Sequence, residues 1–147
     1  MNKRLVGRLL IWITIVVTYM GCTSHRATPP NQREPLTSPS GKYVLRMPIV
    51  QRNLPAQYGP TNVWTVTISK PDGTLVYEDL KSDFLGHFNV YWCWDQNDRV
   101  WLYNSDDGRV WYWENVGGTW IKTELSKTNP TVTPPTEVYP DYAKPKK

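Results

Sequence analysis

Apolar and aromatic residues alternate with polar ones in short runs over the middle of the chain. Clusters of Gly, Asp, Asn and Pro separate the runs, and no run shows a helical period. Such alternation is typical of strands that bury one face. The pattern predicts seven strands: Tyr43–Pro48, Asn62–Ser69, Thr74–Asp79, Phe88–Trp94, Arg99–Asn104, Arg109–Glu114 and Thr119–Glu124. We therefore expect an all-β domain, a small antiparallel meander folded as a partly rolled sheet or a small sandwich.

Two turn sequences support this meander. Lys70-Pro71-Asp72-Gly73 and Ser105-Asp106-Asp107-Gly108 each suit a type I turn followed by glycine in the left-handed conformation. Both predict a hairpin between the flanking strands.

The last four runs carry a ten-residue repeat, in which Asn89-Val90-Tyr91-Trp92 recurs as Arg99-Val100-Trp101-Leu102 and Arg109-Val110-Trp111-Tyr112, and weakly at Thr119. A period of this length fits one strand and one tight turn. With three-residue loops, Cys93 would face Trp101 and Tyr91 would face Tyr103, while Trp101 would face Trp113 and Tyr103 would face Trp111. The opposite sheet face is then the better candidate for the core: Val90, Trp92, Trp94, Val100, Leu102, Val110 and Tyr112.

An exposed face of aromatic rings can stack on sugars or bind a protein partner. The candidate binding residues are Tyr91, Trp101, Tyr103, Trp111 and Trp113, flanked by Arg99 and Arg109. The alternative is that both faces are buried and the rings are the core of a domain short of Leu and Ile. The two arginines would then only stack on neighbouring rings.

Two motifs resemble the blades of bacterial β-propellers of the TolB and WD-repeat kind. Ser38-Pro39-Ser40-Gly41-Lys42-Tyr43-Val44 is similar to their Ser-Pro-Asp-Gly-Lys-Tyr opening, with Ser40 in place of Asp, and Trp94-Asp95 before Arg99-Val100-Trp101 is similar to their Trp-Asp corner. A propeller needs at least about four blades of four strands, more than this chain supplies. The resemblance therefore implies a local blade-like sheet and no particular function. Assembly between chains is one way to cover the sheet edges.

The N-terminus has the pattern of a secretory leader. Lys3, Arg4 and Arg8 precede an apolar run from Leu9 to Met20, which is shorter than the roughly 20 residues that a membrane-spanning helix needs. Tyr19-Met20-Gly21-Cys22 resembles a partial lipobox of bacterial lipoproteins. That resemblance implies a signal peptide over residues 1–21 and acyl chains, such as palmitate, on Cys22; the alternative is an uncleaved membrane anchor. We expect a cell-envelope protein held to the membrane by lipid, with its domain on the periplasmic or extracellular side.

Composition divides the rest of the chain. Residues 22–40 and 126–147 are polar and rich in proline, which predicts a disordered linker and a disordered tail around an all-β domain at 41–125. Between Gly41 and Glu124 there are eight Lys and Arg against ten Asp and Glu, a balance of minus two. Nucleic acid is therefore not an expected partner, because phosphate binding needs a basic face. Envelope proteins and glycans are the candidate partners, beside membrane lipid at Cys22.

Nothing in the sequence indicates an enzyme, a metal site or a cofactor. Cys93 is the only thiol besides Cys22 and lies among aromatic residues, which favours a buried role. The turn aspartates are typical of side chains that bond local backbone. The sequence favours a binding or interaction module. A structural or accessory envelope protein is the alternative, and a carboxylate-dependent glycan hydrolase involving Glu114 is a remoter one.

Overall fold

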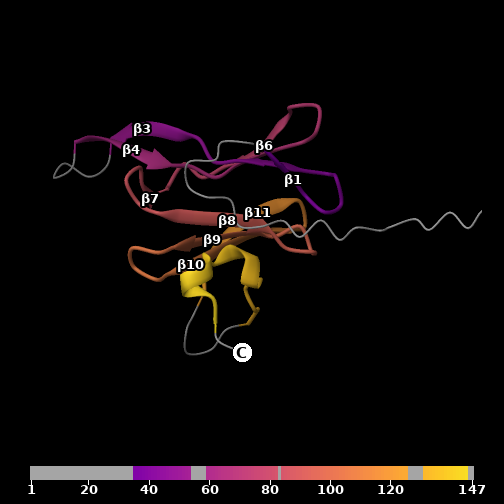
Figure 1. Ribbon diagram of the computed structural model, residues 1–147. Helices are drawn as coiled ribbons and strands as arrows, with labels where there is room; N and C mark the ends of the chain where they lie inside the picture. The colour runs from indigo at the N-terminus through magenta and orange to yellow at the C-terminus, as the bar shows by residue number, and fades with distance from the viewer. Residues whose placement is uncertain (1–34, 54–58, 83, 126–130, 146–147) are drawn as a thin grey trace, which may run out of the picture.

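The computed structural model describes residues 35–53, 59–82, 84–125 and 131–145. Over these residues the protein is all-β, with three antiparallel sheets packed in layers as a small sandwich, which confirms the expected fold class (Figure 1). The leader and Cys22 lie outside the described residues.

The described residues form eleven strands. The first sheet has the order β1 (Leu36–Thr37), β2 (Val44–Arg46), β5 (Thr67–Ser69), β6 (Leu75–Glu78). A small sheet has the order β3 (Ile49–Asn53), β4 (Pro60–Trp64), β7 (Phe84–Leu85). The third, called the meander sheet below, has the order β11 (Thr119–Glu124), β10 (Val110–Val116), β9 (Val100–Asn104), β8 (Val90–Trp94). Two 3-10 helices follow, η1 (Thr136–Val138) and η2 (Asp141–Ala143).

The sequence run from Asn62 to Ser69 is divided between two sheets. β4 pairs with β3 and β7, whereas β5 pairs with β2 and β6. Between them Thr65 donates its backbone N–H to Pro48 at 2.9 Å, and Val66 accepts one from Asp79 at 2.9 Å. At the crossing Val63, Trp64, Thr65 and Val66 are all buried, so both faces of the chain are covered there. The sequence nevertheless keeps alternating through Thr65 and Thr67, so its pattern does not mark the change of sheet.

Both predicted hairpins are present. Gly73 closes the β5–β6 turn at φ 90° and Gly108 closes the β9–β10 turn at φ 72°, a region that favours glycine. Gly117 and Gly118 make the two-residue β10–β11 turn, both with positive φ, as a type I′ turn requires.

The predicted register is correct for one hairpin of the meander sheet and wrong for the next. β8 and β9 are joined by three loop residues, and Cys93 lies opposite Trp101 and Tyr91 opposite Tyr103, as expected. The β9–β10 loop has four residues, 105–108, because Asn104 pairs with Arg109. Trp101 therefore lies opposite Tyr112 instead of Trp113. A shift of one residue moves every side chain of a strand to the other face.

The inner face of the meander sheet packs on the other two sheets and forms the main core. Its buried side chains are Val90, Trp92, Trp94, Val100, Leu102, Trp111, Trp113 and Trp120. The rings meet those of the opposite layer: Phe84 lies 4.8 Å edge-on from Trp111, and Trp64 lies 5.6 Å from Trp92. Val110 and Tyr112, expected in this core, belong instead to the outer face.

The outer face of the meander sheet consists of Tyr91, Cys93, Trp101, Tyr103, Val110 and Tyr112, and the C-terminal segment covers it (Figure 1). Val138 in this segment is fully buried, and the Tyr139 ring lies 4.9 Å from that of Tyr103. The predicted disorder of 126–147 is therefore wrong over residues 131–145. These residues are too few to form a core of their own, but they dock on an apolar face that the sheet has already formed.

The boundary at residue 40 is also too late. β1 pairs with β2, and the carbonyl of Leu36 accepts the Trp94 indole N–H at 2.9 Å. The folded domain thus includes residues placed in the linker by their proline and serine content.

Candidate functional site

An open pocket of about 400 Å³ lies where the β1–β2 loop and the β8–β9 turn meet strand β10. Its lining is mostly polar and consists of Lys42, Tyr43, Asn97, Asp98, Arg99, Glu114 and Asn115. These residues come from three separate parts of the chain, so the pocket exists only in the folded domain.

Asp95 fixes the β8–β9 turn on one side of the pocket. Its carboxylate accepts the backbone N–H groups of Asn97 at 2.8 Å and Arg99 at 3.0 Å, and the Trp101 indole N–H at 2.9 Å. Asp98, the last loop residue, has φ 57°, the left-handed conformation that aspartate tolerates better than most residues. The turn is thereby held in one shape.

The β1–β2 loop is bonded to this turn. Ser40 donates its backbone N–H to the Asp98 carboxylate at 3.1 Å, and its hydroxyl donates to the other carboxylate oxygen. The Ser40 hydroxyl oxygen also accepts the backbone N–H of Lys42 at 3.2 Å. Asp98 therefore positions the β1–β2 loop, and with it Lys42 and Tyr43, which line the pocket.

The Tyr43 ring packs against two tryptophan rings. Its ring stacks at 6.4 Å on Trp94 and meets Trp120 edge-on at 5.1 Å. Offset and edge-on contacts of this kind add about 0.5–1.5 kcal/mol each beyond burial. The ring is therefore restricted in position before any ligand arrives.

Charged groups of both signs line the pocket, and most of them are paired. Arg99 lies 3.3 Å from Glu114 and 3.6 Å from Asp95. Lys42 differs, because its ammonium makes no ion pair or hydrogen bond to any described residue. Asn115 uses its amide oxygen to accept the Gly118 N–H at 2.9 Å. Its amino group and the Lys42 ammonium are donors that a ligand can use.

The structure does not bring the seven predicted binding residues onto one exposed face. Tyr91, Trp101 and Tyr103 lie on the outer face, under or beside the C-terminal segment, whereas Trp111 and Trp113 lie in the inner core. Trp101 and Trp113 are fully buried, and Trp111 is 5% exposed. The expectation of an open ring face is wrong because of the register shift at the four-residue loop and because the C-terminal segment covers the rings that remain.

The two flanking arginines are in different environments. Arg109 lies over the Trp111 ring at 4.7 Å and also forms ion pairs with Asp107 and Glu124, at 2.8 and 3.8 Å. This agrees with the stacking alternative. Arg99 instead pairs with carboxylates and is the single predicted binding residue that lines the pocket.

A partial signal for the missed residues was present in the two blade-like motifs. Lys42 and Tyr43 belong to the first motif, and Asn97, Asp98 and Arg99 lie within the second, between Asp95 and Val100. The contact between Ser40 and Asp98, which are 58 positions apart, is what joins the two motifs. Spacing along the chain does not show this contact.

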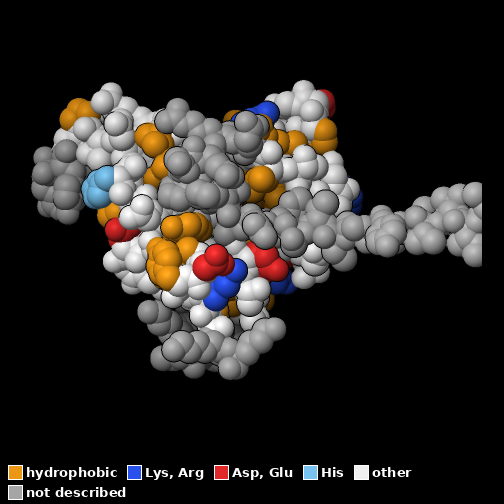
Figure 2. Space-filling view, in the orientation of Figure 1, with side chains coloured by type: hydrophobic (Ala, Val, Ile, Leu, Met, Phe, Trp, Pro, Cys, Tyr) orange, Lys and Arg blue, Asp and Glu red, His pale blue; other side chains and the backbone are white. Residues whose placement is uncertain are grey.

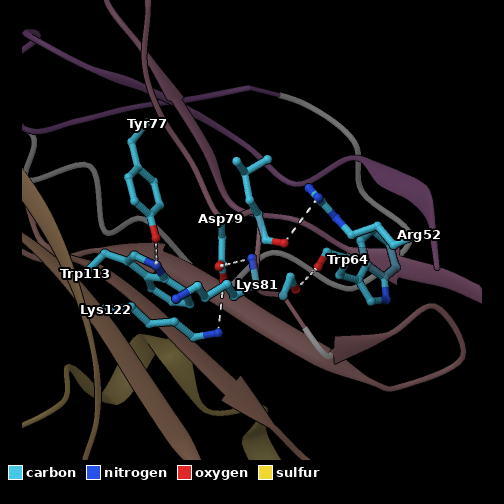
Figure 3. A network of polar contacts seen from close by, with 9 residues as sticks. Arg52, Trp64, Tyr77, Asp79, Lys81, Trp113 and Lys122 are labelled. Carbon is cyan, nitrogen blue, oxygen red and sulfur yellow. Dashed lines mark hydrogen bonds and ion pairs between the residues drawn. The ribbon is translucent and has the colours of Figure 1, made fainter. Parts of the chain in front are cut away.

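A buried polar network links the layers elsewhere in the core (Figure 3). Lys122 on β11 lies 3.0 Å from the Asp79 carboxylate, and the Trp113 indole N–H donates to the Tyr77 hydroxyl at 3.1 Å. Burial raises the pKa of Tyr77, and the Asp79 carboxylate adds to the effect, while the bond from Trp113 lowers it. These bonds join β11 and β10 of the meander sheet to the opposite layer, so we interpret the network as a structural connection between the layers.

Other reactive groups do not form a site in the described part of the chain. Burial raises the pKa of the Cys93 thiol, and nearby Glu137 and Asp95 raise it further. Within the described ranges no three His, Cys, Asp or Glu side chains are grouped so as to hold a metal ion. None of the helices in those ranges is long and apolar enough to span a membrane.

Large exposed hydrophobic side chains are scattered over the surface. They are Ile49, Leu75, Leu80, Val116, Ile121 and Tyr142, and none of the five rings proposed from the sequence is among them. Figure 2 shows separate hydrophobic groups on one side of the molecule, with acidic and basic side chains adjoining one another.

The fold and the pocket define a small, antiparallel all-β protein with an open polar site at one end of its meander sheet. No family model, curated protein or solved structure matches this chain.

Proposed function

We propose that this chain is a lipid-tethered cell-envelope protein whose β domain is a binding module, and that the polar pocket beside Lys42 takes a sugar of an envelope glycan. The leader and the Gly21-Cys22 pair support the proposed cell-envelope location. Two or more acyl chains would hold such a protein firmly, since a single chain binds membranes only marginally.

The observation that carries the binding role is Lys42, whose ammonium has no partner among the described residues, in a pocket whose other charged groups are already fixed. A sugar hydroxyl both donates and accepts hydrogen bonds, so it suits a site that mixes ammonium, amide and carboxylate groups. The ion pairs of Arg99 and the bonds of Asp95 and Asp98 preorganise the walls, which lowers the entropy that binding has to offset.

The same geometry favours binding over hydrolysis. Glycoside hydrolysis requires two carboxyl groups across the scissile bond, one of them protonated to act as the acid. Glu114 is engaged with the Arg99 guanidinium at 3.3 Å, and Asp98 accepts two hydrogen bonds from Ser40. Both carboxylates thus serve to hold the pocket's walls. A purely structural envelope role is the second candidate.

The proposed lipid tether is tested by measuring the intact mass of the membrane-extracted protein and comparing wild type with Cys22→Ser. We expect a chain that begins at Cys22 and carries acyl mass, and that form should be absent from the variant. An unmodified chain beginning at Met1 would refute the lipid tether.

The pocket is tested by retention of the protein on immobilised envelope glycan. Lys42→Met removes the free ammonium, and because this group bonds nothing in the described domain, the fold should be unchanged. A hydrogen bond from a charged group contributes about 1.5–3 kcal/mol, so we expect affinity to fall at least tenfold. Lys70→Met, at another exposed lysine, in the β5–β6 turn, is the matched control and should bind as wild type does. Equal retention of both variants would exclude the pocket, and no retention of the wild type would favour the structural role.

A further inference from the structure

The outer face of the meander sheet is an aromatic surface that already holds a peptide segment. Tyr91, Trp101, Tyr103 and Tyr112 lie on it, and residues 131–145, called the tail below, are packed across it. In Figure 1 the two tail helices lie on the side of the meander sheet opposite the other two sheets. The segment comes after the last strand and adds no strand to the sheet.

The tail is held on the sheet by its side chains. Val138 is its one fully buried side chain, and the Tyr139 ring packs on Tyr103. Tyr142 is 75% exposed. The backbone hydrogen bonds of η1 and η2 close within the tail itself, from Val138 to Pro135, Tyr139 to Thr136 and Ala143 to Pro140. Val132 and Ala143 are partly buried against the same cluster, and Tyr142 hydrogen-bonds with Tyr91. The attachment of the tail to the sheet therefore rests on side chains, and Val138 is the most buried of them.

The tail backbone is extended at the residues that flank its two short helices, whereas the buried Val138 lies in η1. Pro135 has φ −64° and ψ 144°, Tyr139 −92° and 137°, Pro140 −63° and 158°, and Lys144 −60° and 135°. These are polyproline II angles. Extended proline-rich segments are recognised by aromatic-lined grooves, because little conformational entropy is lost when they bind.

We propose that the outer face is a recognition surface for a proline-rich segment of a partner protein with an aliphatic-tyrosine-proline anchor like Val138-Tyr139-Pro140, and that the tail occupies this surface until such a segment displaces it. This surface is distinct from the polar pocket in both residues and ligand chemistry. A tethered tail competes at an effective concentration of about millimolar, so a free peptide of equal affinity binds the intact protein poorly.

The test uses a variant of the full chain in which the tail no longer packs on the sheet. Binding of a fluorescently labelled synthetic peptide of residues 131–145 to this variant is then measured. Val138→Asp places a charge at the buried anchor. Thr133→Asp adds the same charge at an exposed tail position and is the matched control. We expect the labelled peptide to bind Val138→Asp at least tenfold more tightly than it binds the wild type or Thr133→Asp.

Two results would overturn the proposal. The first is a folded Val138→Asp protein, with a cooperative thermal transition, that does not bind the peptide. The second is a wild-type dimer that exchanges tails as concentration rises, which would make a second copy the occupant. If Val138→Asp fails to fold, peptide binding is measured on Tyr139→Ala instead, because this variant removes the Tyr103 contact and leaves Val138 in place. Peptide binding to Tyr139→Ala no tighter than to wild type would then show that the tail is simply part of the core.

Discussion

Replacing Lys122 by methionine should destabilise the domain by about 3 kcal/mol, because it leaves a buried carboxylate without its cation. Asp79 is 3% exposed, and the Lys122 ammonium lies 3.0 Å from its Oδ2 atom. The same ammonium lies 4.6 Å over the Phe84 ring and 5.5 Å over the Trp113 ring. Removal of one partner of a buried ion pair costs about 3–5 kcal/mol, and the partial exposure of the Lys122 side chain places this pair at the lower end.

Asp79→Asn is the companion variant and should cost less, about 1–2 kcal/mol. The asparagine oxygen can still accept the Lys81 N–H, which is 3.2 Å from Oδ1 in the wild type. The Lys122 side chain is 23% exposed, so its ammonium can turn toward water. In the double variant neither charge is buried, and its loss should be smaller than the sum of the two single losses by about 1–2 kcal/mol.

Urea unfolding followed by tryptophan fluorescence measures all four proteins of this cycle. An unchanged urea dependence of the unfolding free energy would show that the variants alter stability and not the surface exposed on unfolding. The reasoning is refuted if Lys122→Met lies within about 0.5 kcal/mol of wild type, or if the two single losses simply add.

Three further predictions follow from other contacts. Gly118→Ala should lower stability by about 1–2 kcal/mol in thermal unfolding, because alanine is strained at φ 91°, and no loss would mean that the β10–β11 turn adopts another conformation. A hydrogen bond with Tyr142 and burial raise the pKa of Tyr91 to about 12. The stability that this neutral phenol contributes should therefore be present below pH 10 and be lost as the pH rises toward 12. In an absorbance titration of tyrosine at about 295 nm, Tyr91→Phe should remove the ionisation step near pH 12. In Cys22→Ser protein, Cys93 should react with a thiol reagent only as fast as local unfolding exposes it, and Val138→Asp should speed this reaction. Rapid labelling of folded Cys22→Ser protein would contradict the burial of Cys93.

Local turn chemistry predicted the hairpins, because Gly73 and Gly108 carry the required conformations in their own short sequences. Strands β1 and β7, with two residues each, are too short to show alternation, and β3 is partly exposed on both faces. The register of β9 and β10 could not be predicted from Ser105-Asp106-Asp107-Gly108, since this sequence is compatible with a loop of three or of four residues. One residue of loop length decided which tryptophans are in the core.

The pocket illustrates a second limit of prediction from sequence. Arg99 is a candidate from sequence because it flanks a ring, yet it lines the pocket as a partner of Glu114. The bond between Ser40 and Asp98 is what brings Lys42 and Tyr43 beside it. The docking of residues 131–145 on the sheet could not be predicted either. Their proline content indicates disorder when the segment is considered alone, and its partner is a surface built from strands far earlier in the chain.

The register shift also decides where this domain can bind anything. A fully buried ring such as Trp113 could reach a ligand only if the sheets separated, which would expose an apolar core worth several times the roughly 1.5–3 kcal/mol of one large side chain. Binding is therefore expected at places that can change without separating the sheets. The described chain offers two, the pocket at the loop ends, where Lys42 is free, and the outer face, where the tail is held by Val138 and Tyr139. Because the first offers hydrogen-bonding groups and the second aromatic rings, they should take ligands of different chemistry, and variants of Lys42 and Val138 should separate the two activities.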